Sequence, residues 1–192
     1  NKLTGRLRDS KEIVLAACRS GSGMARYESV PRGLFFFVGP TLQADRDFFL
    51  KALEEFTHVT IEYASASIQD DIDVVLAVVR RDGSELKYAS PRLKADFEVV
   101  LAAVSSDACP EFPTLQYADP QLCNNREIVL AAIRKAGHSL QYASEALKDD
   151  KEVVLSAIDA SDGSVLGYAS HALRSSRNVV LYALEKDGNN LR

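Results

Sequence analysis

The side chains best able to do chemistry in this chain are three histidines, three cysteines and one short glycine-rich segment. His58, His138 and His171 are too widely separated to form the closely spaced pairs of a metal-binding helix. The Gly-Ser-Gly segment at 21–23 follows an expected helix, whereas a phosphate-binding loop leads into the start of one. We therefore predict no catalytic residue, no metal site and no cofactor, and the sequence favours a protein that is not an enzyme.

The three cysteines are Cys18, Cys109 and Cys123. An odd and sparse count is not a disulfide framework, and no zinc-ligand spacing is present. Cys18 occupies a position that holds Val, Ile or Leu elsewhere in the chain, so we expect it to be a small core residue. Cys109 and Cys123 could meet across a loop, but reduced thiols are the simpler interpretation. We therefore expect an intracellular, reducing compartment, with the organelle left open.

The composition excludes two classes of function. The chain has 192 residues with 46% hydrophobic and 26% charged residues, which is ordinary for a soluble folded protein. Its net charge of -4 argues against binding to a phosphate backbone, which requires a basic surface. No uninterrupted apolar run, including Leu34 to Val38, is longer than six residues, whereas a membrane helix needs about 20 such residues. We expect no nucleic-acid partner and no transmembrane segment.

One aromatic residue recurs at intervals of 26, 25, 29, 25 and 26 residues. A row of rings could stack on nucleic-acid bases or on peptide side chains. Alternatively, each ring packs between helices while its hydroxyl finds a polar partner. The absence of a hydroxyl at one position and the lack of flanking basic charge favour packing. The recurring residues are Phe37, Tyr63, Tyr88, Tyr117, Tyr142 and Tyr168.

Each aromatic belongs to a longer repeated phrase, which indicates how these residues are positioned. An apolar residue always follows five positions later, and then come an acidic residue and a triplet such as Val-Val-Leu. Self-similarity at this period is typical of a repeat array, in which neighbouring units bury one another's apolar faces. We predict one array over residues 1–192, without an internal domain boundary. The apolar residues of the phrase are Leu42, Ile68, Leu93, Leu122, Leu147 and Leu173.

The repeated phrase predicts two helices and a turn in each unit. A helix-capping residue stands three positions before every triplet, an alanine usually follows, and a glycine often ends the expected helix. A Ser or Thr then opens a shorter helix, and a one-turn linker leads to the next unit. The fold class is therefore all-α: an α-solenoid of about seven units of 25–26 residues. The capping residues are Ser10, Asp45, Asp71, Asp96, Asn125, Asp150 and Ser176.

The segment from Leu140 to Leu155, LQYASEALKDDKEVVL, resembles the repeat of the family catalogued as domain of unknown function 4116. The resemblance covers nearly the whole chain, most strongly from Ile61 to Gly188 and most weakly over 16–40. It implies a tandem helical-repeat module with no established catalytic activity. It therefore assigns no functional residue.

Two departures from the repeat period are candidate binding sites. Residues 21–33 and 108–113 lengthen the connection between a long helix and the following short one, on one edge of the array. Insertions in repeat proteins often bind partners, although inert surface loops remain the alternative. Exposed apolar side chains there would form a contact surface. The predicted partner-binding residues are Met24, Tyr27, Val30, Cys109 and Phe112.

These observations support three hypotheses for function. The first is a non-catalytic scaffold that binds a protein partner. The second is an accessory structural subunit embedded in a large assembly. The third, nucleic-acid binding, is opposed by the charge balance. Incomplete repeats at both ends also predict that other polypeptide continues or caps the array.

Overall fold

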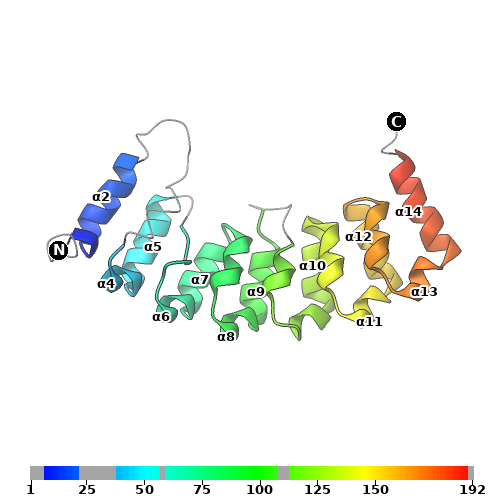
Figure 1. Cartoon of the computed structure of the whole chain (residues 1–192), viewed down its shortest axis with the longest axis horizontal. Coiled ribbons are helices and arrows are strands. Elements are labelled where there is room, and N and C mark those ends of the chain that lie inside the picture. Colours follow the sequence, from blue (N-terminus) through cyan, green and yellow to red (C-terminus); the bar gives the residue numbers. More distant parts are fainter. Residues whose placement is uncertain (1–6, 22–37, 57–58, 108–112, 190–192) are drawn as a thin grey trace.

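The protein folds as a curved row of helices. The computed structural model describes residues 7–21, 38–56, 59–107 and 113–189, the side chains of 17–21 and 188–189 excepted. Within these ranges all regular structure is helical. Long helices stand side by side from α2 at one end to α14 at the other, and short helices line one edge of the row (Figure 1). The predicted all-α solenoid is confirmed.

The long helices begin where the sequence predicts. In five of them the capping side chain accepts a hydrogen bond from a backbone N–H of the first turn, as Asp45 does from Phe48 at 2.9 Å. α2 and α14 likewise start directly after Ser10 and Ser176. The long helices are α2 (Lys11–Gly21), α5 (Arg46–Glu55), α7 (Ile72–Val79), α9 (Phe97–Val104), α10 (Arg126–Lys135), α12 (Lys151–Ala160) and α14 (Arg177–Asn189).

In four of the described units both shorter elements form, with one difference from prediction. The element that carries the aromatic is a 3₁₀ helix, and in three units it starts at the glycine rather than at the Ser or Thr. These 3₁₀ helices are η1 (Gly83–Tyr88), η2 (Thr114–Tyr117), η4 (Gly137–Tyr142) and η5 (Gly163–Tyr168). The one-turn linkers are α4 (Pro40–Gln43), α6 (Ala66–Gln69), α8 (Pro91–Lys94), η3 (Leu122–Asn124), α11 (Glu145–Lys148) and α13 (His171–Arg174).

The predicted role of the glycines is wrong. Gly83, Gly137 and Gly163 do not adopt the left-handed conformation of a helix C′ residue, and Gly188 lies inside α14. Gly83, Gly137 and Gly163 are required because the backbone of the following unit approaches too closely to leave room for a side chain. A Cβ on Gly137 would lie 2.6 Å from the carbonyl oxygen of Ala157, and Gly83 faces Ala103 in the same way. In each case the carbonyl belongs to the alanine that follows the triplet in the next long helix, so the alanine and the glycine together form the close contact.

One unit lacks the expected short helix. Residues 59–65 contain no glycine and form no helical element. The next unit holds this segment in place through Glu85, whose side chain is buried. The Glu85 carboxylate accepts hydrogen bonds from the Thr60 hydroxyl and the Ile61 backbone N–H, both at 2.9 Å. Because these bonds satisfy a buried carboxylate, the segment stays packed without a helix of its own.

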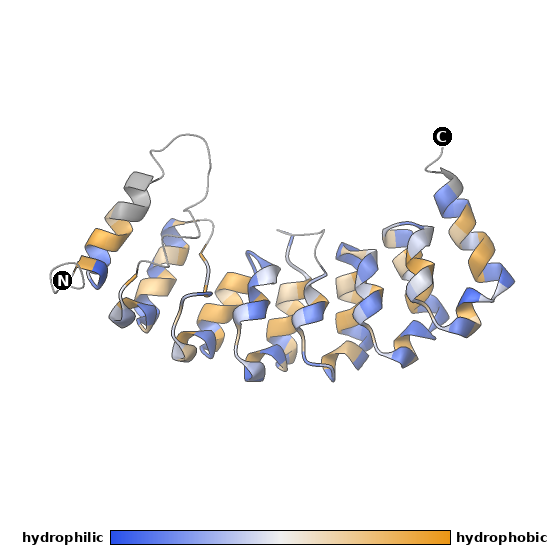
Figure 2. Ribbon diagram, in the orientation of Figure 1, coloured by the Kyte–Doolittle hydropathy of each residue, from blue (hydrophilic) through white to orange (hydrophobic). Residues whose placement is uncertain are grey.

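The core is a continuous apolar spine that passes through all units. The first residue of the triplet is 0% exposed in six helices, from Phe48 in α5 to Val179 in α14. Hydrophobic residues concentrate along the long helices (Figure 2). An isolated helix of about ten residues is marginal in water, so each unit depends on the neighbours that cover this face.

A periodic hydrogen-bonded seam joins the units along the short-helix edge. The backbone N–H two residues after each aromatic donates to a linker carbonyl of the preceding unit, at 2.8–2.9 Å. The six donor–acceptor pairs are Gly39–Arg8, Ser65–Gln43, Ser90–Gln69, Asp119–Lys94, Ser144–Cys123 and Ser170–Lys148. Because the bonds are made by the backbone, this seam tolerates different side chains at the acceptor position.

The serines of the seam also explain the polar pairs Asp70-Asp71, Asn124-Asn125 and Asp149-Asp150, which precede three of the long helices. The Ser90 hydroxyl donates to Asp70 of the preceding unit and accepts from Leu93 N–H at 3.3 Å. That hydroxyl and the nearby Arg92 guanidinium lower the pKa of the Asp70 carboxyl. The first member of the Asp70-Asp71 pair thus binds the next unit, while the second caps its own helix. Ser144 with Asn124 and Ser170 with Asp149 repeat the arrangement.

Candidate functional site

The predicted partner-binding residues are not among those the structure describes. Met24, Tyr27, Val30, Cys109 and Phe112 all fall outside the described ranges, as do Phe37 and the side chain of Cys18. The flanking elements are in place: α2 ends at Gly21, and η2 begins directly after Pro113. The assignment of these loops to partner binding therefore stays a prediction.

The recurring tyrosines pack against the core and are partly buried. Their outer ends meet polar or aromatic neighbours: the Lys87 ammonium lies 4.4 Å from the centre of the Tyr88 ring, and the His138 and Tyr168 rings meet edge to face at 6.0 Å. Burial raises the pKa of the Tyr88 hydroxyl. Of the recurring apolar residues, Leu42, Ile68, Leu93 and Leu147 are buried, while Leu122 and Leu173 are partly buried against the core.

The two histidines that the structure describes do not converge on a site. His138 contacts Tyr168 in the next unit, His171 begins α13, and His58 falls outside the described ranges. Among the described residues, no group of three or more His, Cys, Asp or Glu side chains is placed to hold a metal ion. In the same part of the chain, no helix is both long enough and apolar enough to cross a membrane.

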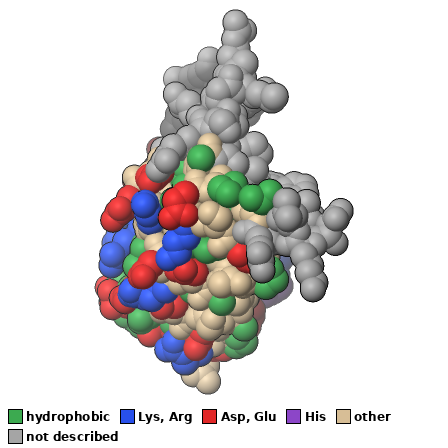
Figure 3. All heavy atoms as spheres, turned by 90° about the vertical axis from the view of Figure 1, so that its left-hand side faces the viewer, with side chains coloured by type: hydrophobic (Ala, Val, Ile, Leu, Met, Phe, Trp, Pro, Cys, Tyr) green, Lys and Arg blue, Asp and Glu red, His purple; other side chains and the backbone are tan. Residues whose placement is uncertain are grey.

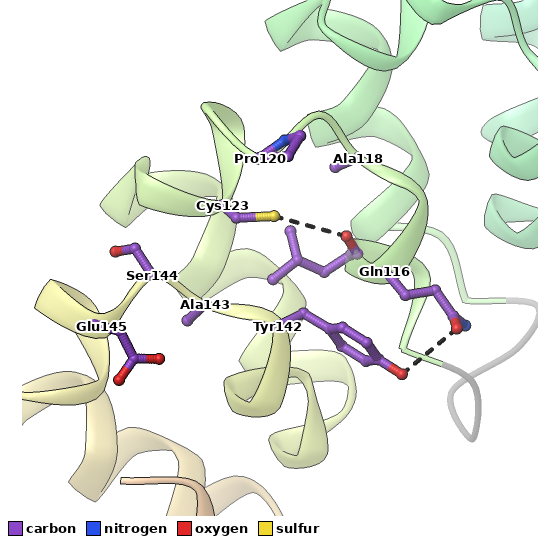
Figure 4. A pocket seen from close by; sticks show the side chains of 9 residues that line it. Gln116, Ala118, Pro120, Cys123, Tyr142, Ala143, Ser144 and Glu145 are labelled. Carbon is purple, nitrogen blue, oxygen red and sulfur yellow. Dashed lines mark hydrogen bonds between the residues drawn. The ribbon is translucent and has the colours of Figure 1, made fainter. Parts of the chain in front are cut away.

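A pocket of about 360 Å³ opens on the surface between two units. One side is formed by η2 and η3, and the other by the junction of η4 and α11 (Figure 4). The lining is mostly apolar, and the Tyr142 hydroxyl donates to Gln116 Oε1 at 3.5 Å at its rim. The lining residues are Leu115, Gln116, Ala118, Pro120, Cys123, Tyr142, Ala143, Ser144 and Glu145.

The pocket exists because one position in the repeat carries an unusually short side chain. Six residues after the aromatic, the other units place a long polar chain: Gln43, Gln69, Lys94, Lys148 or Arg174. Three of these fold back to donate to a backbone carbonyl of their own unit, at 3.1, 3.0 and 2.6 Å in chain order. Cys123 occupies this position in the pocket unit, and its thiol reaches only to 3.9 Å from the Leu115 carbonyl. The volume that a longer side chain would fill is left open.

Cys123 is a free thiol with little nucleophilic character. Burial raises its pKa, and the negative charge of Asp119 adds to that effect. A thiol whose pKa is raised stays protonated at neutral pH, whereas nucleophilic and metal-binding chemistry requires the thiolate. The pocket is therefore suited to receiving an apolar group rather than to forming a covalent bond. The sequence alone shows that a cysteine replaces the long polar residue at this repeat position. It does not show the pocket, because the pocket depends on how the long polar side chains fold over their own units.

A row of ion pairs follows the starts of the long helices. At two junctions the first residue of one helix pairs with the capping residue of the next and with the acidic residue two positions beyond that cap. Arg126 lies 3.5 Å from Asp150 and 2.6 Å from Glu152. Arg46 pairs with Asp71 and Asp73, and Lys11 with Asp45. Basic and acidic side chains interleave along one side of the molecule (Figure 3).

The stacked helical units, joined by a repeated pattern of contacts, define a helical-repeat protein. A sequence model of the family Domain of unknown function (DUF4116) matches the chain five times, and the chain belongs to that family. Each match begins at the capping residue of a long helix and extends into the following unit. The matched residues are 45–94, 71–110, 96–148, 125–170 and 150–192. Comparison with curated proteins and with solved structures found no match.

Proposed function

We propose that the chain is a non-catalytic scaffold that binds a protein partner, and that the Cys123 pocket receives an apolar side chain of that partner. The observation that carries this proposal is the pocket itself, which opens at the unit where the repeat departs from its long polar side chain. A buried apolar anchor in a preformed pocket is how protein interfaces commonly gain affinity. The proposal includes a reducing compartment, in which Cys123 remains a thiol.

The electrostatics support a role in binding rather than in catalysis. Catalytic groups have pKa values shifted toward their task in a shared cleft. Here the carboxyls whose pKa is lowered form helix caps, hydrogen bonds and ion pairs within the array. Asp150 caps α12, Asp70 binds the serine of the next unit, and Asp159 accepts bonds from Lys186 and Tyr182. These carboxyls therefore cap helices and join the units to one another, and none of the three lines the pocket.

The test is a selection of random peptides on the immobilised chain, followed by measurement of their affinity for Cys123→Lys. Lysine already occupies this position at Lys94 and Lys148, so the variant should fold while its longer side chain fills the pocket. We expect the selected peptides to carry an apolar or aromatic anchor. Their dissociation constants should rise at least about tenfold on Cys123→Lys, or ~1.4 kcal/mol.

Gln69→Lys is the matched control, because it changes the same position in another unit and keeps a long polar side chain there. Peptide affinity should be unchanged in this variant. Peptides that bind Cys123→Lys as tightly as the original chain would refute the assignment of the pocket. Selected peptides without any apolar anchor would refute the proposed chemistry of recognition.

A further inference from the structure

Two exposed apolar side chains lie at the same repeat position in the middle of the row. Ile72 is the first residue of α7 and Phe97 is the first residue of α9, and they are 37% and 40% exposed. Between α2 and α14, no other large apolar side chain that the structure describes is exposed to this extent. The helices α7 and α9 are neighbours that pack against each other (Figure 1). Single exposed apolar residues are ordinary, but two in adjacent units form a patch.

The other long helices carry a basic residue at this position. Inside the row, such a residue pairs with the start of the next long helix, as Arg46 does with Asp71 at 2.9 Å. Ile72 and Phe97 therefore interrupt the row of ion pairs at two successive junctions. The basic first residues are Lys11, Arg46, Arg126, Lys151 and Arg177.

The interruption removes the basic residues but keeps the acidic ones. At the junction of α7 with α9, the facing cap is Asp96, which makes no ion pair with any described residue. At the junction of α9 with α10, the facing acidic residue is Glu127, which also has no basic partner in the described part of the chain. Glu98 reaches Arg80 at 3.7 Å, in a pair whose side chains are 68% and 63% exposed. The helices α7 and α9 themselves contain no basic residue.

The charge around the patch determines which partner it fits. Acidic residues that lack an ion-pair partner favour a ligand that carries Lys or Arg beside its apolar groups. Arg92 in the intervening linker α8 is already paired with Asp70 at 3.0 Å. A second copy docked through the same patch would place acidic residues against acidic residues, and an anionic membrane or a nucleic acid would be repelled in the same way. The ligand is therefore a protein segment that is both apolar and basic.

The spacing of the patch matches one face of an α-helix. Neighbouring packed helices lie about 8–10 Å apart, so the first residues of α7 and α9 are separated by roughly that distance. Two side chains seven positions apart on a helix share one face and are about 10 Å apart. Side chains on one face of an extended strand are about 7 Å or about 13 Å apart, which matches the patch less well.

We propose that Ile72 and Phe97 form a docking surface for an amphipathic helix of another protein. Two apolar side chains of that helix cover the patch, and its Lys or Arg side chains pair with Asp96 and Glu127. This surface is an addition to the Cys123 pocket, because neither Ile72 nor Phe97 lines that pocket. Binding at the patch does not require the pocket to be occupied.

The test selects helical peptides, randomised on one face, on immobilised chain that carries Cys123→Lys, so that the pocket is already filled. The selected peptides should carry two apolar residues about two turns apart and at least one Lys or Arg, and they should bind the original chain equally well. Their affinity should fall at least about tenfold on the double variant Ile72→Arg/Phe97→Arg. Arginine occupies this position in α5 and α10, so the double variant should fold. Lys151→Arg is the matched control and should leave the affinity unchanged.

Removing the acidic charges tests the ion pairs separately. Asp96→Asn keeps a helix cap, because Asn125 caps α10 through the same type of hydrogen bond. Glu127→Gln changes an exposed side chain. Each variant should weaken peptide binding about two- to fivefold at low salt and reduce its dependence on salt.

Three results would overturn the proposal. The first is a library that yields no binder, or binders without a basic residue. The second is unchanged affinity for Ile72→Arg/Phe97→Arg. The third is a clear loss of stability of that double variant in urea, since it would mean that the chain itself covers Ile72 and Phe97.

Discussion

The interior of the array and its two ends carry the same apolar positions but bury them differently. Ile158 in α12 and Leu184 in α14 occupy one repeat position, yet the first is 0% exposed and the second 58%. Hydrophobic periodicity determines which face of a helix is apolar, and the neighbouring unit determines whether that face is buried. Stability in such an array is therefore a property of adjacent pairs of units, and a substitution should be judged by its neighbours.

The largest effect is expected when the side chain at this repeat position is shortened to alanine in both regions. Ile158→Ala should lower the free energy of unfolding by about 2–5 kcal/mol, because it leaves a cavity between packed units. Leu184→Ala should change it by less than about 0.5 kcal/mol in the monomer, because the removed atoms are largely in water. Amide hydrogen exchange in α12 and α14, measured at low protein concentration, reports both effects.

Equal losses in the two variants would contradict the comparison, since they would mean that the α14 face is covered in the monomer. A loss at Leu184 that grows with protein concentration would instead indicate burial by association. The interior variant should show no dependence on concentration, because its cavity lies within one chain.

The second test concerns close approach of backbones in the interior. Gly83→Ala should lower the free energy of unfolding by about 1–3 kcal/mol, because the added Cβ would collide with the backbone carbonyl of Ala103. Gly167→Ala is the matched control, since nothing lies within 4 Å of a Cβ at that position. It should be neutral or stabilising by up to about 1 kcal/mol, because alanine restricts the unfolded chain. Urea unfolding followed by circular dichroism measures both, and a destabilised control would refute the explanation.

The sequence predicts the helices well, because their signals are local. Asp45, Asp71 and Asp96 cap helices as expected, and the triplets that follow are buried at their first two positions. It does not predict the contacts between units. The role of Gly83 depends on a carbonyl in the following long helix, and that of Glu85 depends on Thr60 in the preceding unit. Such contacts arise from stacking geometry, which no single repeat specifies.

The candidate site illustrates the same limit. Cys123 differs from the long polar residues at its position, and that difference is visible in the sequence. In other units Gln43, Gln69 and Lys94 fold back over their own unit at this position, whereas the shorter Cys123 leaves the space open. That folding back is a feature of the packed structure. The exposure of Leu184 was likewise invisible, because Leu184 has the sequence pattern of a core residue.

The smallest test compares two helix caps of similar geometry, of which only one carries a titratable group. The N–H groups of Val153 and Glu152 and the charge of Arg126 outweigh burial and hold the pKa of the Asp150 carboxyl below its usual 3.8. Because the folded pKa is lowered, its contribution is full above that usual value and is lost as the pH falls through the folded value. Asn125 caps α10 in the same geometry without a charge.

Removing either cap by alanine should cost about 1 kcal/mol at neutral pH. As the pH falls below the usual value of 3.8, the cost of Asp150→Ala should shrink while that of Asn125→Ala persists, which hydrogen exchange in α12 and α10 would measure. A pH-independent cost at Asp150 would show that its charge contributes nothing to the cap.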